Sequence, residues 1–271
     1  MITPTIKKCL LVCWASLDAV LVPLAVLPRS WRIVRWVEQL THRGATMPPF
    51  HPNLGLDNDR VERWWEWLLA KMRLTVPHRW FWHFYAYALP LSLTGAALVF
   101  FEVGATAALP AVMLSIQVAR RLVEAIRFAK LRPHSRMTLM GYIFGMVYYT
   151  LASLTVYCAS SHVQLSVVSL LLFTASTVWQ TRLHGELAEC ARKAGPAPES
   201  RATPRGWSFE RAVYPHFGAE VLVYCAVVMA APCAMTWGML ATVVGNLVMA
   251  ARAARDAQDL QHKAMMIPYL V

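Results

Sequence analysis

Long runs of apolar residues constrain the fold of this 271-residue chain more than any other feature. A helix needs about 20 mostly apolar residues to cross the hydrocarbon core of a bilayer. The composition agrees, because 57% of the residues are hydrophobic and only 15% are charged, which does not suit a soluble globule. We therefore expect an all-α, multi-span helical membrane protein with about seven transmembrane helices, near residues 9–28, 81–101, 103–119, 137–160, 162–179, 219–232 and 233–251.

The last two runs and the first run each allow an alternative interpretation. Pro232 divides the last apolar stretch, so the two final spans could instead be one kinked helix with a re-entrant piece, which would leave six spans. The first run follows Lys7 and Lys8 as the apolar part of a signal peptide does, but it contains Asp18 and lacks a clean cleavage site of small residues. We expect this run to be retained as a span.

Basic residues are distributed unevenly over the connections between the expected spans. Lys7 and Lys8 are the only Lys and Arg residues that fall outside the first, third and fifth connections and the C-terminal tail. The positive-inside rule then places these connections and the C-terminus in the cytoplasm. The formal net charge of +11 could also serve a nucleic-acid binder, but the apolar runs favour contact with anionic lipid or phosphorylated ligands, and we expect no nucleic-acid partner.

The loops and cysteines indicate no separate soluble domain and no metal site. Residues 47–55 contain three prolines and cannot form a regular helix, whereas residues 60–72 form an amphipathic, tryptophan-rich segment typical of a membrane interface. Residues 193–206 have the composition of an exposed loop. The six cysteines form no CxxC pair, so a disulfide framework or zinc site is not expected.

Soluble-type nucleotide sites are also excluded by the motifs. The sequence contains no GxGxxG, GxxxxGK[ST] or HExxH pattern, which are the signatures of dinucleotide, P-loop and metalloprotease sites. Any cofactor would therefore bind in a pocket formed by the membrane helices.

Polar residues spaced four apart near the ends of spans are the candidate site residues. This spacing places both members of a pair on one helix face. A carboxylate near membrane depth, such as Glu220, indicates a functional site unless it only pairs with an arginine of a neighbouring helix. The pairs are Arg120 with Glu124, Gln180 with His184, and His216 with Glu220.

An aromatic segment opens the second expected span. In VPHRWFWHFYAYA (76–88) the tryptophans and phenylalanines fit an interfacial belt. His83 differs, because an imidazole among aromatic rings can donate a proton to a ligand. In QVARRLVEAIRF (117–128), the group Arg120, Arg121 and Glu124 is either a charged helix end or an anchor for phosphates.

Several segments together resemble the polyprenol reductase branch of the steroid 5-alpha-reductase family, whose members are multi-span membrane enzymes that use NADPH. The resemblance covers about residue 76 to the end, so we divide the chain into residues 1–75, with the first span and an amphipathic cytoplasmic loop, and residues 76–271, a family-like catalytic membrane domain. The matching segments are VPHRWFWHFY (76–85), QVARRLVEAI (117–126), FGMVYYTLASLTV (144–156), WQTRLHGELAECARK (179–193), PRGWSFERAVYPHFGAE (204–220) and KAMMIPYLV (263–271).

The resemblance implies roles for individual residues. The catalytic group would include Glu124, with His83, Tyr85 or Tyr149 as the hydrogen-bond donor to the substrate. The residues implied to bind NADPH are Arg120, Arg121, Gln180, His184, Arg192, Lys193, His216, Glu220, Asn246 and Arg255. No metal is implied.

The resemblance further implies a reductase of the endoplasmic reticulum membrane, acting on a long-chain polyisoprenoid in dolichol biosynthesis for protein glycosylation. Hydride addition to an α,β-unsaturated aldehyde gives an enolate that a nearby donor stabilises, which an allylic alcohol does not offer. We therefore expect polyprenal to be the species that is reduced.

One segment departs from the family pattern. The stretch 251–264 is several residues shorter than in the family and has Arg255 where the family has a histidine. A non-catalytic, isoprenoid-binding member is therefore one alternative. An isoprenylcysteine-type membrane methyltransferase is another, although its RHPxYxG pattern is absent at residues 214–220.

Overall fold

The computed structural model describes residues 3–27, 74–131, 135–164, 166–194, 204, 206–257 and 264–266. The expected irregular loop at 47–55, the interfacial segment at 60–72 and most of the loop and tail near 193–206 and 258–271 lie outside these residues. The helices are α1 (Pro4–Val26), α4 (Trp82–Glu102), α5 (Ala105–Leu131), α6 (Leu139–Cys158), α7 (Val167–Ala194), α8 (Trp207–Arg211), α9 (Pro215–Ala230) and α10 (Ala234–Ala257).

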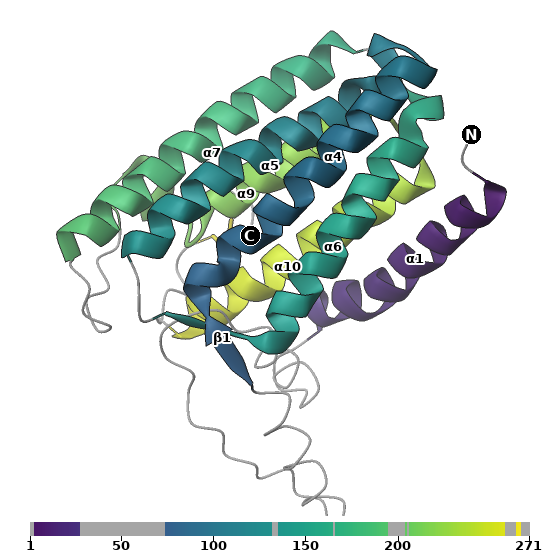
Figure 1. The fold of residues 1–271 in the computed structure, drawn as a ribbon. Coiled ribbons are helices and arrows are strands. Elements are labelled where there is room, and N and C mark those ends of the chain that lie inside the picture. The colour runs from purple at the N-terminus through teal and green to yellow at the C-terminus, as the bar shows by residue number, and fades with distance from the viewer. Residues whose placement is uncertain are drawn as a thin grey trace, which may run out of the picture.

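The long helices pack side by side in a bundle, as Figure 1 shows, so the chain is a multi-span helical membrane protein. Five helical segments are long and apolar enough to cross a membrane, namely α1, α4 with the turn before it, α5, α6 and α10. Helix α9 is apolar but has only 16 residues, or about 24 Å at the usual helical rise. Helix α7 has 28 residues and carries polar and charged side chains from Gln180 onward.

Each expected span therefore corresponds to one helix, but several bounds differ. Helix α5 continues to Leu131 and α7 to Ala194, beyond the expected ends at 119 and 179. Helix α7 begins at Val167 rather than near 162, because the 3-10 turn η2 (Ala159–His162) follows α6. Helix α9 begins at Pro215, a residue suited to the first helical turn because its missing N–H would have no partner there. Pro232 lies between α9 and α10, which are separate helices and not one kinked helix.

Two short strands, which the sequence patterns did not indicate, connect the starts of α4 and α6. Strand β1 (Thr75–Pro77) pairs antiparallel with β2 (Arg136–Thr138), and Thr75 lies opposite Thr138. The turn η1 (His78–Phe81) leads from β1 into α4, while Thr138 accepts a hydrogen bond from the Gly141 amide and caps α6. This pairing fixes the first turns of α4 and α6 next to each other.

Helix α1 belongs to the folded core. Trp14 is 1% exposed, and its indole N–H donates to Thr155 of α6 over 2.8 Å. Thr242 of α10 donates to Asp18 over 2.7 Å, and Arg252 donates to the carbonyl oxygens of Ala25 and Leu27 at the end of α1. The single acidic residue of the first apolar run is thus half-buried and accepts a hydrogen bond from the neighbouring helix.

The contact between α1 and α10 depends on a glycine. A Cβ atom added at Gly238 would come 2.7 Å from the Cβ of Trp14, which is too close without movement of one helix. We expect Gly238→Ala to destabilise the protein by about 1–3 kcal/mol, as overpacking of a core does. Thermal unfolding in detergent measures this, with Gly185→Ala as the control because nothing lies within 4 Å of an added Cβ there. Equal unfolding temperatures for the two variants would contradict this packing.

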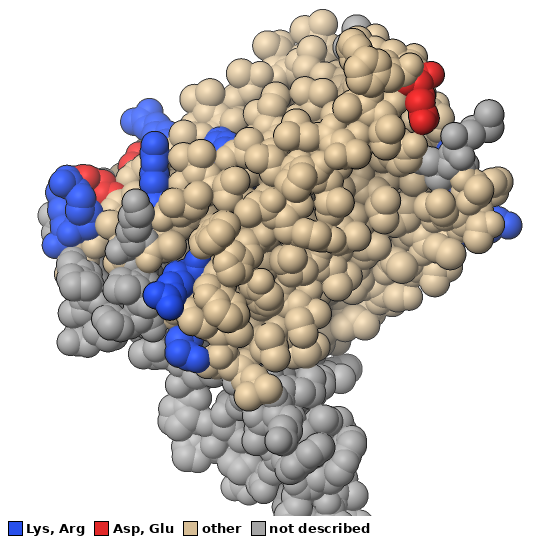
Figure 2. All heavy atoms as spheres, in the orientation of Figure 1, with Lys and Arg blue, Asp and Glu red and all other residues tan. Residues whose placement is uncertain are grey.

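Charged side chains lie mainly at one end of the bundle. Figure 2 shows Lys and Arg grouped where α5 and α7 end, and a broad surface without charge beyond them. At the other end, Lys7 donates to Ser161. The two groups of basic residues in the sequence are therefore separated in space, and the assignment of the basic end to the cytoplasm remains a prediction.

Candidate active site

A buried polar cluster lies where α5, α7 and α9 meet. Five of its members are at most 9% exposed although they are polar or charged. Polar groups buried at this depth are costly unless they are paired. The members are Gln117, Arg120, Arg121 and Glu124 from α5, Gln180 and His184 from α7, and His216 and Glu220 from α9.

Glu124 is the acceptor that joins the two arginines of α5. Arg120 and Arg121 both form ion pairs with its carboxylate, and the Arg121 pair has an N–O distance of 2.8 Å. Spacings of three and four residues place these side chains on one face of α5. Arg120 also donates to the side-chain oxygen of Gln117 over 2.7 Å and to that of Gln180.

Gln180 and His184 connect α5 to α9. His184 Nδ1 lies 2.5 Å from a Glu124 oxygen. The amide nitrogen of Gln180 donates to Glu220 over 3.3 Å, and the rings of His184 and His216 lie 5.2 Å apart. The three pairs that the sequence places on separate helix faces thus meet in one network. Glu220 reaches Arg120 through Gln180, so it takes part in a larger cluster than a simple pair with one arginine.

Buried tyrosines form a layer next to this cluster, on the side of α4 and α6. The Arg121 guanidinium carbon lies 5.4 Å from the centre of the Tyr85 ring. The rings of Tyr85 and Tyr149 are 5.3 Å apart, and Tyr148 packs against Tyr149 and against Tyr224 of α9. Tyr85 and Tyr149 therefore bring two phenol groups next to a buried arginine.

Donor groups in the cluster are left without a partner. Among the described residues, Nε of Arg120, Nε of Arg121 and Nδ1 of His216 are buried and make no hydrogen bond. Buried polar groups are almost always paired, so these atoms fit a ligand that offers acceptor oxygens. Two arginines face two glutamates, so the formal charges of these four side chains balance.

Four of the residues expected to bind the cofactor lie apart from the cluster. Arg192 and Lys193 are exposed at the end of α7 and pair with Glu189. Asn246 is half-buried on α10, and Arg255 lies in the last turn of that helix. Their contact with a cofactor remains a prediction.

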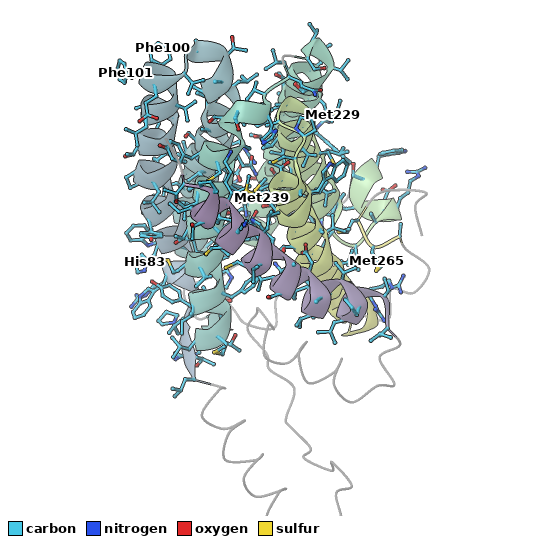
Figure 3. All side chains as sticks on the ribbon, turned by 90° about the vertical axis from the view of Figure 1, so that its right-hand side faces the viewer. His83, Phe100, Phe101, Met229, Met239 and Met265 are labelled. Atoms are coloured by element: carbon cyan, nitrogen blue, oxygen red, sulfur yellow. The ribbon has the colours of Figure 1, made fainter. Side chains whose placement is uncertain are left out.

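His83 faces the outer side of α4, as Figure 3 shows, and its Nδ1 lies 3.1 Å from the Tyr142 hydroxyl of α6. Trp80 stacks on its ring. The structure thus separates His83 from Tyr85, although only one residue lies between them, because successive side chains on a helix point about 100° apart.

Two features of the site were not anticipated from the sequence. Gln117 precedes Arg120 by three residues, and this spacing on the same helix face was a usable signal. The described part of the C-terminal tail pairs with the segment before α9, since the Val213 and Tyr214 amides donate to Ala264 and Met265. The tail thus lies beside the start of the helix that carries His216, a contact between distant segments that no local pattern indicates.

No metal centre is formed within the part of the chain that the structure describes, since no three His, Cys, Asp or Glu side chains are grouped as ligands there.

Comparison with known proteins gives two distant relatives. The chain is 28% identical to a polyprenal reductase of Danio rerio over 204 residues, which cover 66% of this chain and 66% of that protein. It is 25% identical to an uncharacterized protein of Schizosaccharomyces pombe over 231 residues, which cover 74% of this chain and 81% of that protein. No family model matches the chain.

Proposed function

We propose that this protein is an NADPH-dependent reductase of the steroid 5-alpha-reductase family that saturates the alpha-isoprene double bond of polyprenal in the endoplasmic reticulum membrane. The observation that carries the proposal is the similarity to a polyprenal reductase. The buried cluster on α5, α7 and α9 supports it, because a membrane protein rarely buries such a group without a functional reason.

The proposed substrate places specific demands on the side chains around it. NADPH, when bound, supplies the hydride. Reduction of an unsaturated aldehyde places negative charge on the carbonyl oxygen, which a positioned donor stabilises. The phenols of Tyr85 and Tyr149 lie beside Arg121, so they can donate to that oxygen in a positively charged surrounding.

The buried nitrogen atoms without a hydrogen-bond partner indicate which residues would bind the cofactor. Arg120, Arg121 and His216 would hold acceptor oxygens of the ribose and nicotinamide end, and Gln180 and Glu220 would orient them. The exposed Arg192 and Lys193 at the end of α7 would meet the phosphates on the basic side of the membrane. Because the basic loops would then attract NADPH from the cytoplasm, this end of the bundle is the proposed cytoplasmic side.

Glu220→Gln tests the proposal. Membranes that contain the protein are incubated with polyprenal and NADPH, and mass spectrometry measures the gain of two hydrogens. We expect the variant to lower the rate about 10- to 100-fold, the effect of losing a charged hydrogen-bond partner in a buried site. Glu186→Gln is the control. This carboxylate also lies on α7, but it pairs with Arg182 outside the cluster.

A folded wild-type protein that yields no product would instead favour the non-catalytic alternative, for which the altered stretch 251–264 is the supporting feature. Binding of S-adenosylmethionine in place of NADPH would favour the methyltransferase. Measuring the binding of both cofactors to the purified protein distinguishes these results.

A further inference from the structure

Helices α4 and α6 lie side by side (Figure 1). We call the interface between them the α4–α6 seam, and it extends from the surface of the bundle to the buried tyrosines. Two hydrogen bonds cross the seam on its outer side. His83 Nδ1 lies 3.1 Å from the Tyr142 hydroxyl, and the Tyr87 hydroxyl lies 3.1 Å from Oγ1 of Thr150. Tyr87 is 39% exposed, so this outer layer faces the lipid.

Phe84 fills the seam behind these hydrogen bonds. Its ring is 2% exposed and rests on Gly145, where an added Cβ would come 2.9 Å from the ring. The glycine therefore provides the space that the ring occupies. Tyr85 and Tyr149 form the next layer, and Arg121 lies over Tyr85. Phe84 thus lies between the two outer hydrogen bonds and the phenols, with the rings of Phe81 and Tyr142 packed against it.

A long isoprenoid chain cannot fit inside a bundle of this size, and its apolar surface keeps it in the bilayer. Its aldehyde must nevertheless reach Tyr85 and Tyr149 if the proposed function is correct, and the present inference rests on that function. We propose that the α4–α6 seam is the binding site for the first isoprene units of the substrate, with Phe84 displaced from Gly145 when the chain is bound.

A different apolar groove, of about 350 Å³, lies between α1 and α10 and is lined by residues such as Val22, Trp237 and Val248. It is the alternative position for the chain. Trp14 of α1 and Tyr148 of α6 are buried, and their ring centres are 6.0 Å apart. Tyr148 in turn packs against Tyr149. The buried rings of Trp14 and Tyr148 close that route to Tyr149, and we therefore favour the seam.

Photolabelling of the complete protein in lipid nanodiscs tests the inference. The probe is a polyprenal with a diazirine on its second isoprene unit, and mass spectrometry identifies the labelled peptides. We expect label in residues 82–91 of α4 or 142–150 of α6, and we expect excess unlabelled polyprenal to suppress it. Label that is suppressed only in residues 22–26 and 237–248, or label that unlabelled polyprenal does not suppress anywhere, would overturn the inference.

Thr150→Trp gives an independent measurement, because an indole at the outer edge of the seam occupies the place of the chain. We expect KM for long-chain polyprenal to rise about tenfold while kcat changes little, the pattern of lost substrate binding. The control is Val168→Trp, at a position that is 61% exposed on α7. An unchanged KM in Thr150→Trp would count against the seam. A wild-type protein without reductase activity would contradict the proposed function instead, and photolabelling reports binding in that case too.

Discussion

Tyr85→Phe is expected to lower kcat for polyprenal by about 10²- to 10³-fold, the effect of removing a donor that stabilises developing negative charge. Tyr85 is the phenol closest to a cation, since the Arg121 guanidinium lies over its ring. A positive charge at this position stabilises a negative charge on the oxygen to which the phenol donates. The change removes one oxygen atom and leaves the ring packing against Phe81 and Tyr149 in place, so the variant should fold.

Steady-state kinetics with polyprenal and NADPH measure this effect, and thermal unfolding verifies the fold. Tyr149→Phe should show a smaller loss, because the Arg121 guanidinium lies over the ring of Tyr85, and Tyr149 contacts Tyr85 in turn. Tyr157→Phe serves as the control, since Tyr157 lies at the opposite end of α6. If Tyr85→Phe, Tyr149→Phe and the double variant all retain the wild-type kcat, neither phenol is the donor.

Glu124→Ala is expected to destabilise the protein by about 3–5 kcal/mol and to abolish reduction, because removal of one partner leaves buried charge uncompensated. The carboxylate accepts from Arg120 and Arg121 and contacts His184. Its loss would leave two neighbouring guanidinium groups on α5 without the carboxylate that pairs with both, and Glu220 alone would remain to balance them. Glu124→Gln keeps one acceptor oxygen and the size of the side chain, so it should give a smaller loss of stability than Glu124→Ala.

Thermal unfolding in detergent measures the change, and Glu189→Ala is a matched control. Glu189 also bridges two basic side chains, Arg192 and Lys193, but it does so on an exposed helix end. Exposed ion pairs contribute little to stability, since water and salt screen them. If Glu124→Ala unfolds at the same temperature as Glu189→Ala, the cluster does not contribute to the stability of the bundle.

The candidate site could be predicted in its parts but not in its assembly. The four-residue spacings of Arg120 with Glu124 and of Gln180 with His184 follow from helix geometry, which acts over a single turn. Whether the two faces point toward each other depends on how α5 and α7 pack, and this contact joins residues about 60 positions apart. Gln117 could have been included, because it lies on the same face of α5 as Arg120.

The resemblance grouped His83 with Tyr85 and Tyr149, and the structure divides them. Positions two apart on α4 point to nearly opposite sides of the helix, so Tyr85 faces Arg121 while His83 faces Tyr142 on the outside of the bundle. Sequence similarity aligns a segment as a whole and does not fix which of its side chains points inward. Without that orientation, the seam formed by Phe84 and Gly145 could not be recognised.

The sequence by itself determined that the chain is a bundle of membrane helices, which segments form them, and which polar residues share a helix face, although α5 and α7 continue well beyond the expected apolar runs. These properties depend on the lengths of apolar runs and on local spacing, which a bilayer and the helix geometry convert directly into structure. The tertiary structure alone decided that three polar pairs form one cluster, that Tyr85 lies beneath Arg121, and that β1 pairs with β2. These contacts connect distant segments, and side-chain packing between helices selects them, which no local pattern encodes.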